Sequence, residues 1–382
     1  MIEARDFVEA ARAAGFRRYT GVPCSFLTPF INYVINDDGL DYVSAANEGD
    51  AVALGAGSSI GGEAAVVMMQ NSGLGNAVSP LTSLTWVFRI PVLLIVTHRG
   101  EPGLADEPQH ELMGQVTTAM LDTMQIPWRS FPSSPEGIGP ALEAACTWMR
   151  AERRPFALVM KKGTVAAQAL SAVPPPAVPA GADPAVYMSR DGTRPSRADV
   201  LQRLLAATRG GDSVVIATTG FTGRELYALD DRPNHLYMVG SMGCAPALAL
   251  GLAKARPDLR VIVVDGDGAL LMRMGNLATI GAYGGDNLLH LVLDNEAHDS
   301  TGAQATVTAS VNFARAGAAC GYRRTLFGDD PALLDEFLEP GPGPVLAHLK
   351  IGTGTLADLP RPKIRPADVL DRLKNHIGAR RD

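Results

Sequence analysis

Two apolar runs, each followed by a polar residue, contain the side chains of this chain best suited to do chemistry. The run 261–265 leads to Asp267, and the run 288–293 leads to Asn295. Each run reads as a buried strand of a parallel sheet, whose carboxyl end faces the crevice where such sheets bind ligands. Oxygens of Asp267 and Asn295 would meet there, and Mg²⁺ takes one or two protein oxygens together with those of a diphosphate. Gly268 lacks a Cβ and lets the backbone come close to a phosphate.

A Gly-Asp-Gly sequence taken alone could be only a turn between a strand and a helix. Here a strand precedes it, 26 residues (269–294) follow Gly268, and Asn295 comes next, after a second strand. This spacing resembles the motif with which thiamine diphosphate (TPP) enzymes hold their cofactor through a divalent metal. The resemblance implies Mg²⁺ ligands from the side chains of Asp267 and Asn295 and from the backbone carbonyl of Ala297. It also places three further residues at the diphosphate: Gly266, Gly268 and Ala269.

An enzyme of this kind also needs one buried carboxyl group from a separate domain. By the resemblance, this group hydrogen-bonds the pyrimidine ring so that the cofactor's amino group can remove the thiazolium proton, while the cofactor is the electron sink. Glu48 fits because it lies between the strand 41–47 and a run of small residues, 49–57, that reads as a helix. A carboxylate here could also serve only to stabilise the helix N-terminus. Because the metal motif is present in the same chain, we interpret Glu48 as catalytic.

Two turns complete the predicted cofactor site. One follows an apolar strand, and the resemblance implies that Gly240 offers its carbonyl to the cofactor, with Ser241 beside it and Met242 as the support beneath the bent cofactor. Methionine suits this position because it is apolar and adaptable, although it could also be an ordinary core residue. The other turn contains Thr219 and Gly220 and precedes a helix whose N-terminus could bind the diphosphate.

These residues together resemble the TPP-dependent 2-oxoacid decarboxylases, and more narrowly the phosphonopyruvate decarboxylases, with the sulfopyruvate decarboxylases as near relatives. The resemblance covers essentially the whole chain and rests on five segments: 21–30, 44–57, 70–84, 98–110 and 294–304. It implies a carboxy-lyase that converts 3-phosphonopyruvate to phosphonoacetaldehyde and CO₂ in the biosynthesis of phosphonate natural products, including antibiotics. The chain departs from the family at Ala303, where Gly-Gly-Gln is expected and Gly-Ala-Gln is found.

A dianionic substrate needs cationic and hydrogen-bonding groups, because phosphonates accept several charge-assisted bonds. The candidates for substrate binding are Ser25, Asn71, Arg99, His110, Ser300 and Thr301. Arg99 could instead pair with Glu101, and His110 could be an ordinary surface residue of its loop. A proton donor is also needed when the aldehyde forms, and the candidates are His298 and Asp299.

Three alternatives remain open for the function. The chain could decarboxylate sulfopyruvate, since a sulfonate differs from a phosphonate by one ionisable oxygen. It could be a TPP-dependent carboligase, which would need room for an acceptor. It could also bind TPP without catalysis, although the presence of Glu48 argues against this. A nucleotide-binding Rossmann protein is disfavoured, since no GxGxxG opens a helix after the first strand.

Short apolar runs alternate with helical patterns along the chain, which predicts an α/β protein. The resemblance implies two TPP-binding-type domains, each a mainly parallel sheet flanked by helices. The chain is 46% hydrophobic and 19% charged, and its net charge of −6 argues against nucleic acid and membranes as partners. Four cysteines without CxxC spacing, no signal peptide and no long apolar run favour a cytoplasmic enzyme. The predicted domains are 1–171 (pyrimidine-binding) and 189–382 (diphosphate-binding), joined by a proline-rich linker, 172–188. The resemblance further implies a homodimer or larger homo-oligomer, with the active site between subunits.

Overall fold

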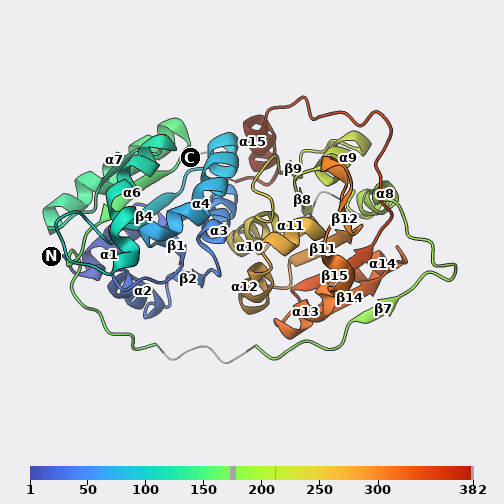
Figure 1. Ribbon diagram of the computed structural model, residues 1–382, viewed down its shortest axis with the longest axis horizontal. Coiled ribbons are helices and arrows are strands. Elements are labelled where there is room, and N and C mark those ends of the chain that lie inside the picture. The colour runs from blue at the N-terminus through green and yellow to red at the C-terminus, as the bar shows by residue number, and fades with distance from the viewer. Residues whose placement is uncertain (173–177, 211, 380–382) are drawn as a thin grey trace. The chain divides into compact units, whose positions relative to one another are not determined.

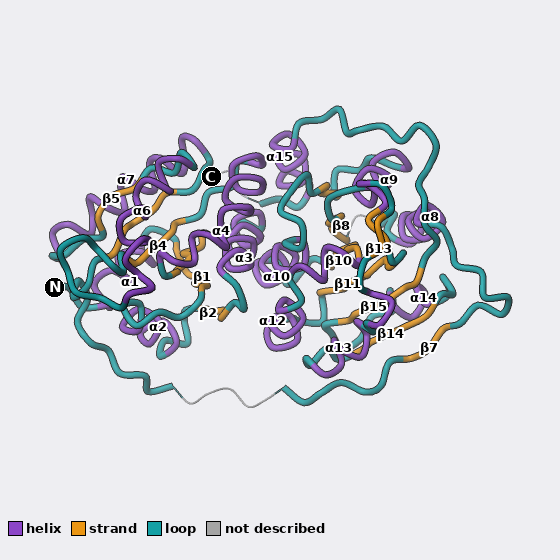
Figure 2. Tube along the Cα trace, in the orientation of Figure 1, coloured by secondary structure: helices purple, strands orange, loops and turns teal. Residues whose placement is uncertain are grey.

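A computed structural model describes residues 1–172, 178–210 and 212–379 of the protein. These residues form two compact units, one on each side of the segment 173–177. Each unit contains a parallel sheet flanked by helices (Figures 1 and 2), which confirms the predicted fold class.

The first unit has a six-stranded sheet in which all neighbouring strands are parallel, in the order β2-β1-β3-β4-β6-β5. Its strands are β1 (Phe16–Gly21), β2 (Asp41–Ser44), β3 (Ala64–Met69), β4 (Leu93–Thr97), β5 (Trp128–Ser130) and β6 (Phe156–Met160). The central strands are runs of aliphatic residues and methionine that are buried along almost their whole length. This is the pattern of a parallel sheet that is covered on both faces.

Helices cover the two faces of this sheet. They are α1 (Ala4–Ala13), α2 (Thr28–Ile35), α3 (Glu48–Ile60), α4 (Leu74–Pro80), α5 (Trp86–Phe88), α6 (Glu111–Thr123) and α7 (Ile138–Glu152). Alternate side chains of a strand belong to two separate cores. Val66 and Met68 of β3 pack in one core with α1, α2 and α7, whereas Val67 and Met69 pack in the other with α3, α4 and α6.

Helix α3 places Glu48 at the carboxyl edge of the sheet. Its N-cap residue, Asn47, accepts a hydrogen bond from the backbone N–H of Gly49 at 2.8 Å, which fixes the start of the helix at Glu48. The small residues of α3 then let it lie close to the sheet. At Gly55, a Cβ would come within 2.7 Å of the Val67 side chain, so this position requires glycine.

The second unit has a seven-stranded parallel sheet in the order β7-β14-β15-β11-β10-β8-β9. Its strands are β7 (Ala185–Tyr187), β8 (Ser213–Ala217), β9 (His235–Tyr237), β10 (Arg260–Gly266), β11 (Leu288–Asp294), β14 (Arg324–Gly328) and β15 (Val345–Lys350). The two strands that carry the metal motif, β10 and β11, are neighbours, with Gly266 opposite Leu293. The polar residues that follow them therefore leave the sheet at the same edge.

Helices and one small hairpin complete the second unit. The helices are α8 (Arg197–Ala207), α9 (Phe221–Leu229), α10 (Ala245–Ala255), α11 (Asp267–Met272), α12 (Gly275–Tyr283), α13 (Phe313–Ala319), α14 (Leu333–Phe337) and α15 (Pro366–His376). The hairpin consists of β12 (Ala297–His298) and β13 (Gln304–Ala305), and it follows β11 directly.

The structure differs from the prediction at the linker 172–188. Residues 173–177 of this prediction lie outside the described part of the chain. Residues 185–187 form β7, which pairs with β14 at one edge of the second sheet. The physical reason is local, because the prolines end at Pro184 and the next three residues have free N–H groups to pair with a strand.

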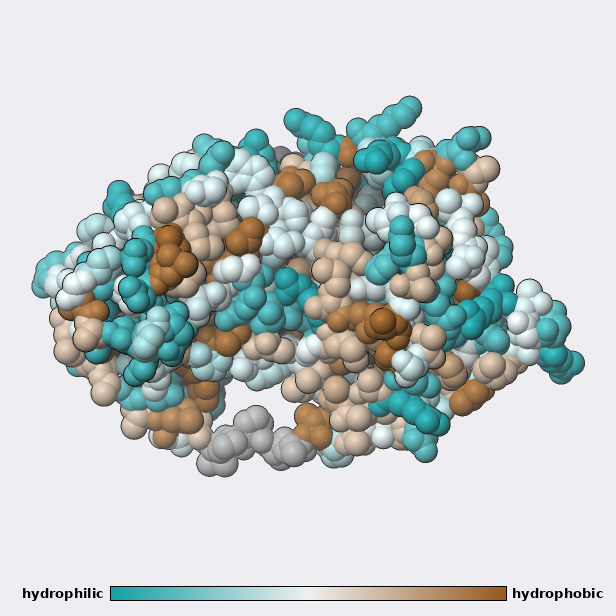
Figure 3. Space-filling view, in the orientation of Figure 1, coloured by the Kyte–Doolittle hydropathy of each residue, from teal (hydrophilic) through white to brown (hydrophobic). Residues whose placement is uncertain are grey.

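On the face in Figure 3, strongly hydrophobic residues form separate patches among hydrophilic and near-neutral residues. Exposed apolar side chains include Leu104, Leu112, Met272 and Val307. Among the described residues, no helix has both the length and the apolar character needed to cross a bilayer.

Candidate active site

Four neighbouring strands of the second sheet, β11, β10, β8 and β9, end at one edge, and the segments that follow them line a single pocket. This is where open parallel sheets bind ligands. The pocket brings together most of the residues predicted for this unit: Thr219, Gly220, Met242, Gly266, Asp267, Gly268, Ala269, Asn295, Ala297, His298, Asp299 and Ser300. Three predicted residues are not among those that line it, namely Gly240, Ser241 and Thr301. Ser241 and Thr301 are next to lining residues in the sequence, and Gly240 is two residues from Met242.

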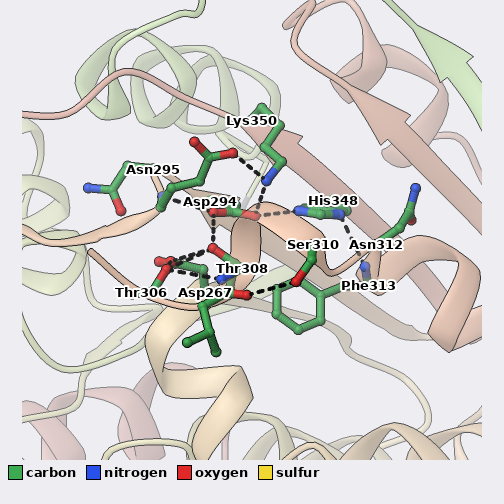
Figure 4. A network of polar contacts seen from close by, with 12 residues as sticks. Asp267, Asp294, Asn295, Thr306, Thr308, Ser310, Asn312, Phe313, His348 and Lys350 are labelled. Atoms are coloured by element: carbon green, nitrogen blue, oxygen red, sulfur yellow. Dashed lines mark hydrogen bonds and ion pairs between the residues drawn. The ribbon is translucent and has the colours of Figure 1, made fainter.

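Asp267 begins α11 and is almost fully buried. Its Oδ2 atom accepts hydrogen bonds from the hydroxyl groups of Thr306 at 2.6 Å and Thr308 at 3.1 Å (Figure 4). Burial raises the pKa of the Asp267 carboxyl group, and the nearby charge of Asp294 raises it further, while the bond from Thr306 opposes the change. Ionised Asp267 is therefore costly here, and a cation bound at this carboxylate would offset that cost.

Asp294, at the end of β11, has no solvent exposure and interacts with three side chains, those of His348, Lys350 and Thr308. Its Oδ2 atom lies 2.8 Å from Nε2 of His348 and 2.7 Å from Nζ of Lys350 (Figure 4). Its Oδ1 atom accepts from Thr308 at 3.0 Å. Burial alone would raise the pKa of Asp294, but the bonds from His348 and Lys350 prevail and lower it to about 2. Asp294 is therefore a permanent negative charge behind the pocket.

Asn295 has a fixed amide orientation. Its Nδ2 donates to Oδ2 of Asp299 at 2.6 Å, and its Oδ1 accepts from the N–H of Ala297 at 3.3 Å. The intervening Glu296 has a φ of +60°, a left-handed conformation that is uncommon for a residue other than glycine and that turns the chain sharply. Side chains of Arg194 and Lys350 pair with Glu296 and help to hold this turn.

Gly268 is flanked by two side chains of the pocket. A Cβ on Gly268 would lie 2.5 Å from Cε1 of His298 and 3.4 Å from Cε of Met242. Only glycine therefore lets the start of α11 lie open to a ligand between these two residues. His298 and Met242, which come from different strands' loops, are brought together as predicted.

The donor atoms of this pocket suit a hard divalent cation that shares its coordination with a diphosphate. Asp267 provides one carboxylate, Asn295 one amide oxygen and Ala297 one backbone carbonyl. Mg²⁺ accepts such oxygen donors and usually keeps further positions for phosphate oxygens and water. The residues present therefore fit the predicted TPP and Mg²⁺.

Asp299 is less available for proton transfer than expected. Its Oδ2 atom accepts from Nη2 of Arg197 at 2.8 Å, from Asn295 and from the backbone N–H of Gly354 at 3.1 Å. These three donors hold the carboxylate in one position. This arrangement favours a positioning role for Asp299 and leaves His298 as the stronger candidate for a proton donor.

A second candidate site lies at the carboxyl edge of the first sheet. The neighbouring strands β2, β1, β3 and β4 are followed by Glu48, Ser25, Asn71 and Arg99 respectively. The predicted residues of this unit therefore gather at one edge, as the rule for parallel sheets requires.

Glu48 is held by residues that follow β3. Its Oε2 atom accepts a hydrogen bond from Nδ2 of Asn76 at 2.8 Å. Its carboxyl group lies against Gly73, where a Cβ would come within 2.4 Å of Oε1. Glu48 is thus the first residue of α3, and its carboxyl group has a defined position.

Arg99 pairs with Asp106 and not with Glu101, whose partner is Lys161. The Asp106 carboxylate accepts from Nε of Arg99 at 2.7 Å and also from Nη2, while Nη1 donates to Ser25 at 3.2 Å. The alternative of an Arg99–Glu101 salt bridge is therefore wrong. The Arg99 guanidinium group lowers the pKa of Asp106 well below its usual range.

His110 and Asn71 are buried beside this loop. His110 is 5% exposed and its Nδ1 atom has no hydrogen-bond partner, so the alternative of an ordinary surface residue is wrong. Asn71 donates to the backbone carbonyl of Arg99 at 2.8 Å and to the hydroxyl of Thr117 at 2.9 Å, which ties the loop to the sheet. A buried imidazole with an unsatisfied nitrogen is a candidate ligand for a polar group of a substrate.

Thr218, Phe221 and Thr222 belong to the turn 218–222 that the sequence predicted at the diphosphate, and they line the pocket of the second unit together with Thr219 and Gly220. Sequence reasoning missed two other residues that line this pocket, Leu293 and Arg197. For Arg197 no sequence signal existed, because it lies 102 residues from its partner Asp299.

Comparisons with known proteins agree with this geometry. Residues 3–125 match the family described as "Thiamine pyrophosphate enzyme, N-terminal TPP binding domain", and residues 218–334 match its C-terminal TPP binding domain. The chain is 44% identical to a phosphonopyruvate decarboxylase of Streptomyces viridochromogenes over 99% of this chain and 95% of that protein. It is 36% identical to a sulfopyruvate decarboxylase subunit beta of Methanothermobacter thermautotrophicus over 49% of this chain and 98% of that protein.

A solved structure shares the fold. The TPP-dependent 4-hydroxybenzoylformate decarboxylase of Rhodococcus jostii RHA1 superposes with a TM-score of 0.70 at 13% identity, covering 93% of this chain and 100% of that chain. At this identity the likeness concerns the fold alone.

Proposed function

The chain belongs to the phosphonopyruvate decarboxylase family of thiamine pyrophosphate enzymes, and from this premise we propose that it converts 3-phosphonopyruvate to phosphonoacetaldehyde and CO₂. The observation that carries the proposal is the convergence of Asp267 and Asn295 in one pocket of a chain that is similar over its whole length to such a decarboxylase. A role in phosphonate biosynthesis follows from this reaction.

In the second unit, we propose that Asp267, Asn295 and the carbonyl of Ala297 hold Mg²⁺, and that Thr219 and Gly220 receive the diphosphate at the N-terminus of α9. When bound, TPP supplies the nucleophilic carbon and the electron sink that decarboxylation requires. Met242 and the open backbone at Gly268 shape the pocket, and the buried charge of Asp294 fixes the loop that presents Asn295. Gly240 and Ser241 are assigned to the cofactor by family resemblance.

In the first unit, we propose that Glu48 holds the proton that the cofactor's pyrimidine ring shares during activation. Its hydrogen bond from Asn76 and its contact with Gly73 keep the carboxyl group in one place. Because Glu48 and Asp267 belong to different units, we also propose, as in related enzymes, that the complete active site forms between two copies of the chain. A cytoplasmic location and the homo-oligomer remain predictions.

Replacing Gly73 by Ala should lower kcat by about 10- to 100-fold, because the new Cβ would displace the Glu48 carboxyl group and small misplacements of a catalytic group have effects of this size. The backbone at Gly73 has a φ of −73°, so alanine adds no strain of its own. TPP affinity should change little. Gly75→Ala is the matched control, since a Cβ at Gly75 meets nothing within 4 Å. Wild-type kcat in the Gly73→Ala variant would argue against this role of Glu48.

We propose that Arg99, Ser25 and His110 receive the phosphonate end of the substrate. Asn71, whose two amide N–H groups already donate to Arg99 and Thr117, holds the loop that presents Arg99. Asp106 holds Nε and Nη2 of Arg99, and Nη1 remains directed toward Ser25. The unsatisfied nitrogen of His110 offers a further hydrogen bond in the same unit. We assign Ser300, Thr301 and His298 to the reacting end of the substrate, with His298 as the group that transfers the proton.

Replacing Arg99 by Met should lower kcat/KM for phosphonopyruvate by about 10- to 100-fold, as expected for the loss of a hydrogen bond to a charged group. Activity on pyruvate, which has no phosphonate, should change much less, so the preference between the two substrates should collapse. Lys161→Met is the control, because it breaks the Glu101 ion pair on the same loop without touching Arg99. An unchanged preference in Arg99→Met would remove Arg99 from substrate recognition.

The function can be tested directly by ³¹P NMR. Protein freed of metal with a chelator is mixed with phosphonopyruvate, and TPP and Mg²⁺ are added separately and together. The proposal expects phosphonoacetaldehyde only when both are present. No aldehyde under any of these conditions would contradict it.

Sulfopyruvate remains the second candidate substrate. Sulfopyruvate decarboxylase relatives cover 49% of this chain at 36% identity and 78% at 29% identity, whereas the phosphonopyruvate relative covers 99% at 44% identity. This difference favours the phosphonate. A TPP-dependent carboligase is the third candidate and predicts a product larger than the aldehyde.

A further inference from the structure

Arg197 is a buried cation that joins three segments of the second unit. It begins α8, and its side chain is 6% exposed. Its Nη2 donates to Asp299 at 2.8 Å, and its Nη1 donates to Glu225 of α9 at 3.3 Å and to the carbonyl of Gly354 at 3.1 Å. Asp299 and Glu225 are equally buried, so one guanidinium group neutralises two carboxylates away from water.

The Asp299 carboxylate transmits the position of Arg197 to Asn295. Its Oδ2 atom accepts from Arg197 and, at 2.6 Å, from Nδ2 of Asn295. A carboxylate can only accept, so the NH₂ group of Asn295 must face it and the amide oxygen must face the other way. Figure 4 shows the Asn295 amide directed away from the Asp294 carboxylate. The amide oxygen is the atom that a metal would need, and Asp299 prevents the amide from flipping.

The same cluster fastens a long surface segment, residues 352–365, which we term the strap. It connects β15 with α15, and much of it is exposed. The N–H of Gly354 donates to Asp299 at 3.1 Å. The hydroxyl of Thr355 and the N–H of Leu356 donate to Oε1 of Glu225 at 2.5 Å and 3.2 Å. The two carboxylates that Arg197 pairs thus hold the strap at residues 354–356, while Arg224 and Tyr227 of α9 bond to it at residues 359, 360 and 363.

We propose that Arg197 is a positioning residue that couples metal binding at Asn295 to closure of the strap. Through Asp299 it orients the Asn295 amide toward the metal, and through Asp299, Glu225 and Gly354 it holds the strap in place. The inference rests on the proposed TPP and Mg²⁺ site. Coupling between two sites is reciprocal. If the attached strap raises the affinity for metal, then bound metal must stabilise the attached strap by the same free energy.

Metal affinity gives the first test. Mn²⁺ binding to the full chain in the presence of TPP is measured by electron paramagnetic resonance, without substrate. Arg197→Met should weaken Mn²⁺ binding by about 10- to 100-fold, as is typical when a residue that orients a metal ligand is lost. Arg197→Lys should recover part of this loss, since an ammonium group restores the charge but not the planar fork that reaches both carboxylates. Arg203→Met is the control, because Arg203 lies on the same helix and pairs with Asp335 at the surface.

Limited proteolysis gives the second test. Lys363 is exposed and is the one Lys or Arg of the strap that is not followed by proline, so trypsin can cut the strap after it. In the wild-type protein, Mg²⁺ and TPP together should slow this cut. In Arg197→Met the cut should be fast and insensitive to the cofactors. Thr355→Val removes one partly buried hydrogen bond to Glu225, so it should speed the cut and weaken Mn²⁺ binding less than Arg197→Met does.

The possible failures are distinguishable. If the wild-type protein binds no Mn²⁺ with TPP, the proposed function fails. If it binds Mn²⁺ and both Arg197 variants bind it equally well, the positioning role is wrong. If Mg²⁺ and TPP do not change the rate of cleavage after Lys363 in the wild-type protein, the proposed coupling to the strap is wrong. Because Arg197→Met leaves two buried carboxylates without a cation, Arg197→Lys and Thr355→Val keep the tests valid if that variant does not fold.

Discussion

Replacing Glu48 by Gln should leave TPP and Mg²⁺ bound and lower kcat by about 10²- to 10⁴-fold, the range expected when a group that moves a proton in catalysis is lost. Glutamine has nearly the same shape, and its carbonyl oxygen can still accept the hydrogen bond from Asn76. It cannot hold and release the proton. The expected loss of kcat is measured as turnover at saturating cofactor. The expected retention of TPP and Mg²⁺ is measured as cofactor binding in the absence of substrate.

A matched control for this variant exists in the same unit. Glu63 precedes β3 at the opposite edge of the sheet and pairs with Arg18. Glu63→Gln should therefore retain wild-type turnover. If Glu48→Gln were as active as Glu63→Gln, the assignment of Glu48 as the catalytic carboxyl group would be wrong.

Replacing Asp267 by Asn should weaken the binding of Mg²⁺ with TPP by at least about 100-fold. Loss of a residue that only orients a metal ligand lowers metal affinity by about 10- to 100-fold. Loss of the charge of the ligand itself should lower metal affinity at least as much. The apo protein should be as stable as the wild type or more so. Burial and the charge of Asp294 raise the pKa of Asp267, which means that its ionised form is unfavourable in the absence of a cation.

The expected loss of metal affinity without a loss of apo-protein stability distinguishes a missing metal ligand from a folding defect. A general folding defect would lower both Tm and metal affinity, whereas the expected result is weaker metal binding with an unchanged or higher Tm of the apo protein. Asp258→Asn, which removes a surface ion pair with Arg256, is the control for a lost aspartate charge. Wild-type affinity for Mg²⁺ and TPP in Asp267→Asn would exclude Asp267 as a ligand.

The sequence predicted the placement of those site residues that directly follow a strand. Long buried runs such as 261–265 and 288–293 are recognisable because only a sheet covered on both faces tolerates them. Once such runs are parallel neighbours, the residues after them must share an edge, and Asp267 and Asn295 do so in the structure. The spacing of these residues resembles the TPP motif, which implied the TPP-binding domains, and the family match confirms them. Mg²⁺ and the individual site residues remain predictions.

The sequence did not predict contacts that join distant segments through side chains alone. Arg197 and Asp299, or Thr308 and Asp267, meet only because loops fold over the sheet edge, and no spacing encodes this. The same applies to the burial of His110. The substitution noted at Ala303 has a local cost, because this residue adopts a φ of +59°, where glycine would be unstrained.

The most direct test of the central claim is a comparison of kcat/KM for phosphonopyruvate, sulfopyruvate and pyruvate with TPP and Mg²⁺ present, measured as release of aldehyde. The proposed function predicts cofactor-dependent turnover that strongly favours phosphonopyruvate. A preference for sulfopyruvate would retain the fold, the metal site and the role of Glu48 but would contradict the assigned substrate. Absence of aldehyde from all three substrates would contradict the assignment of the chain as a decarboxylase.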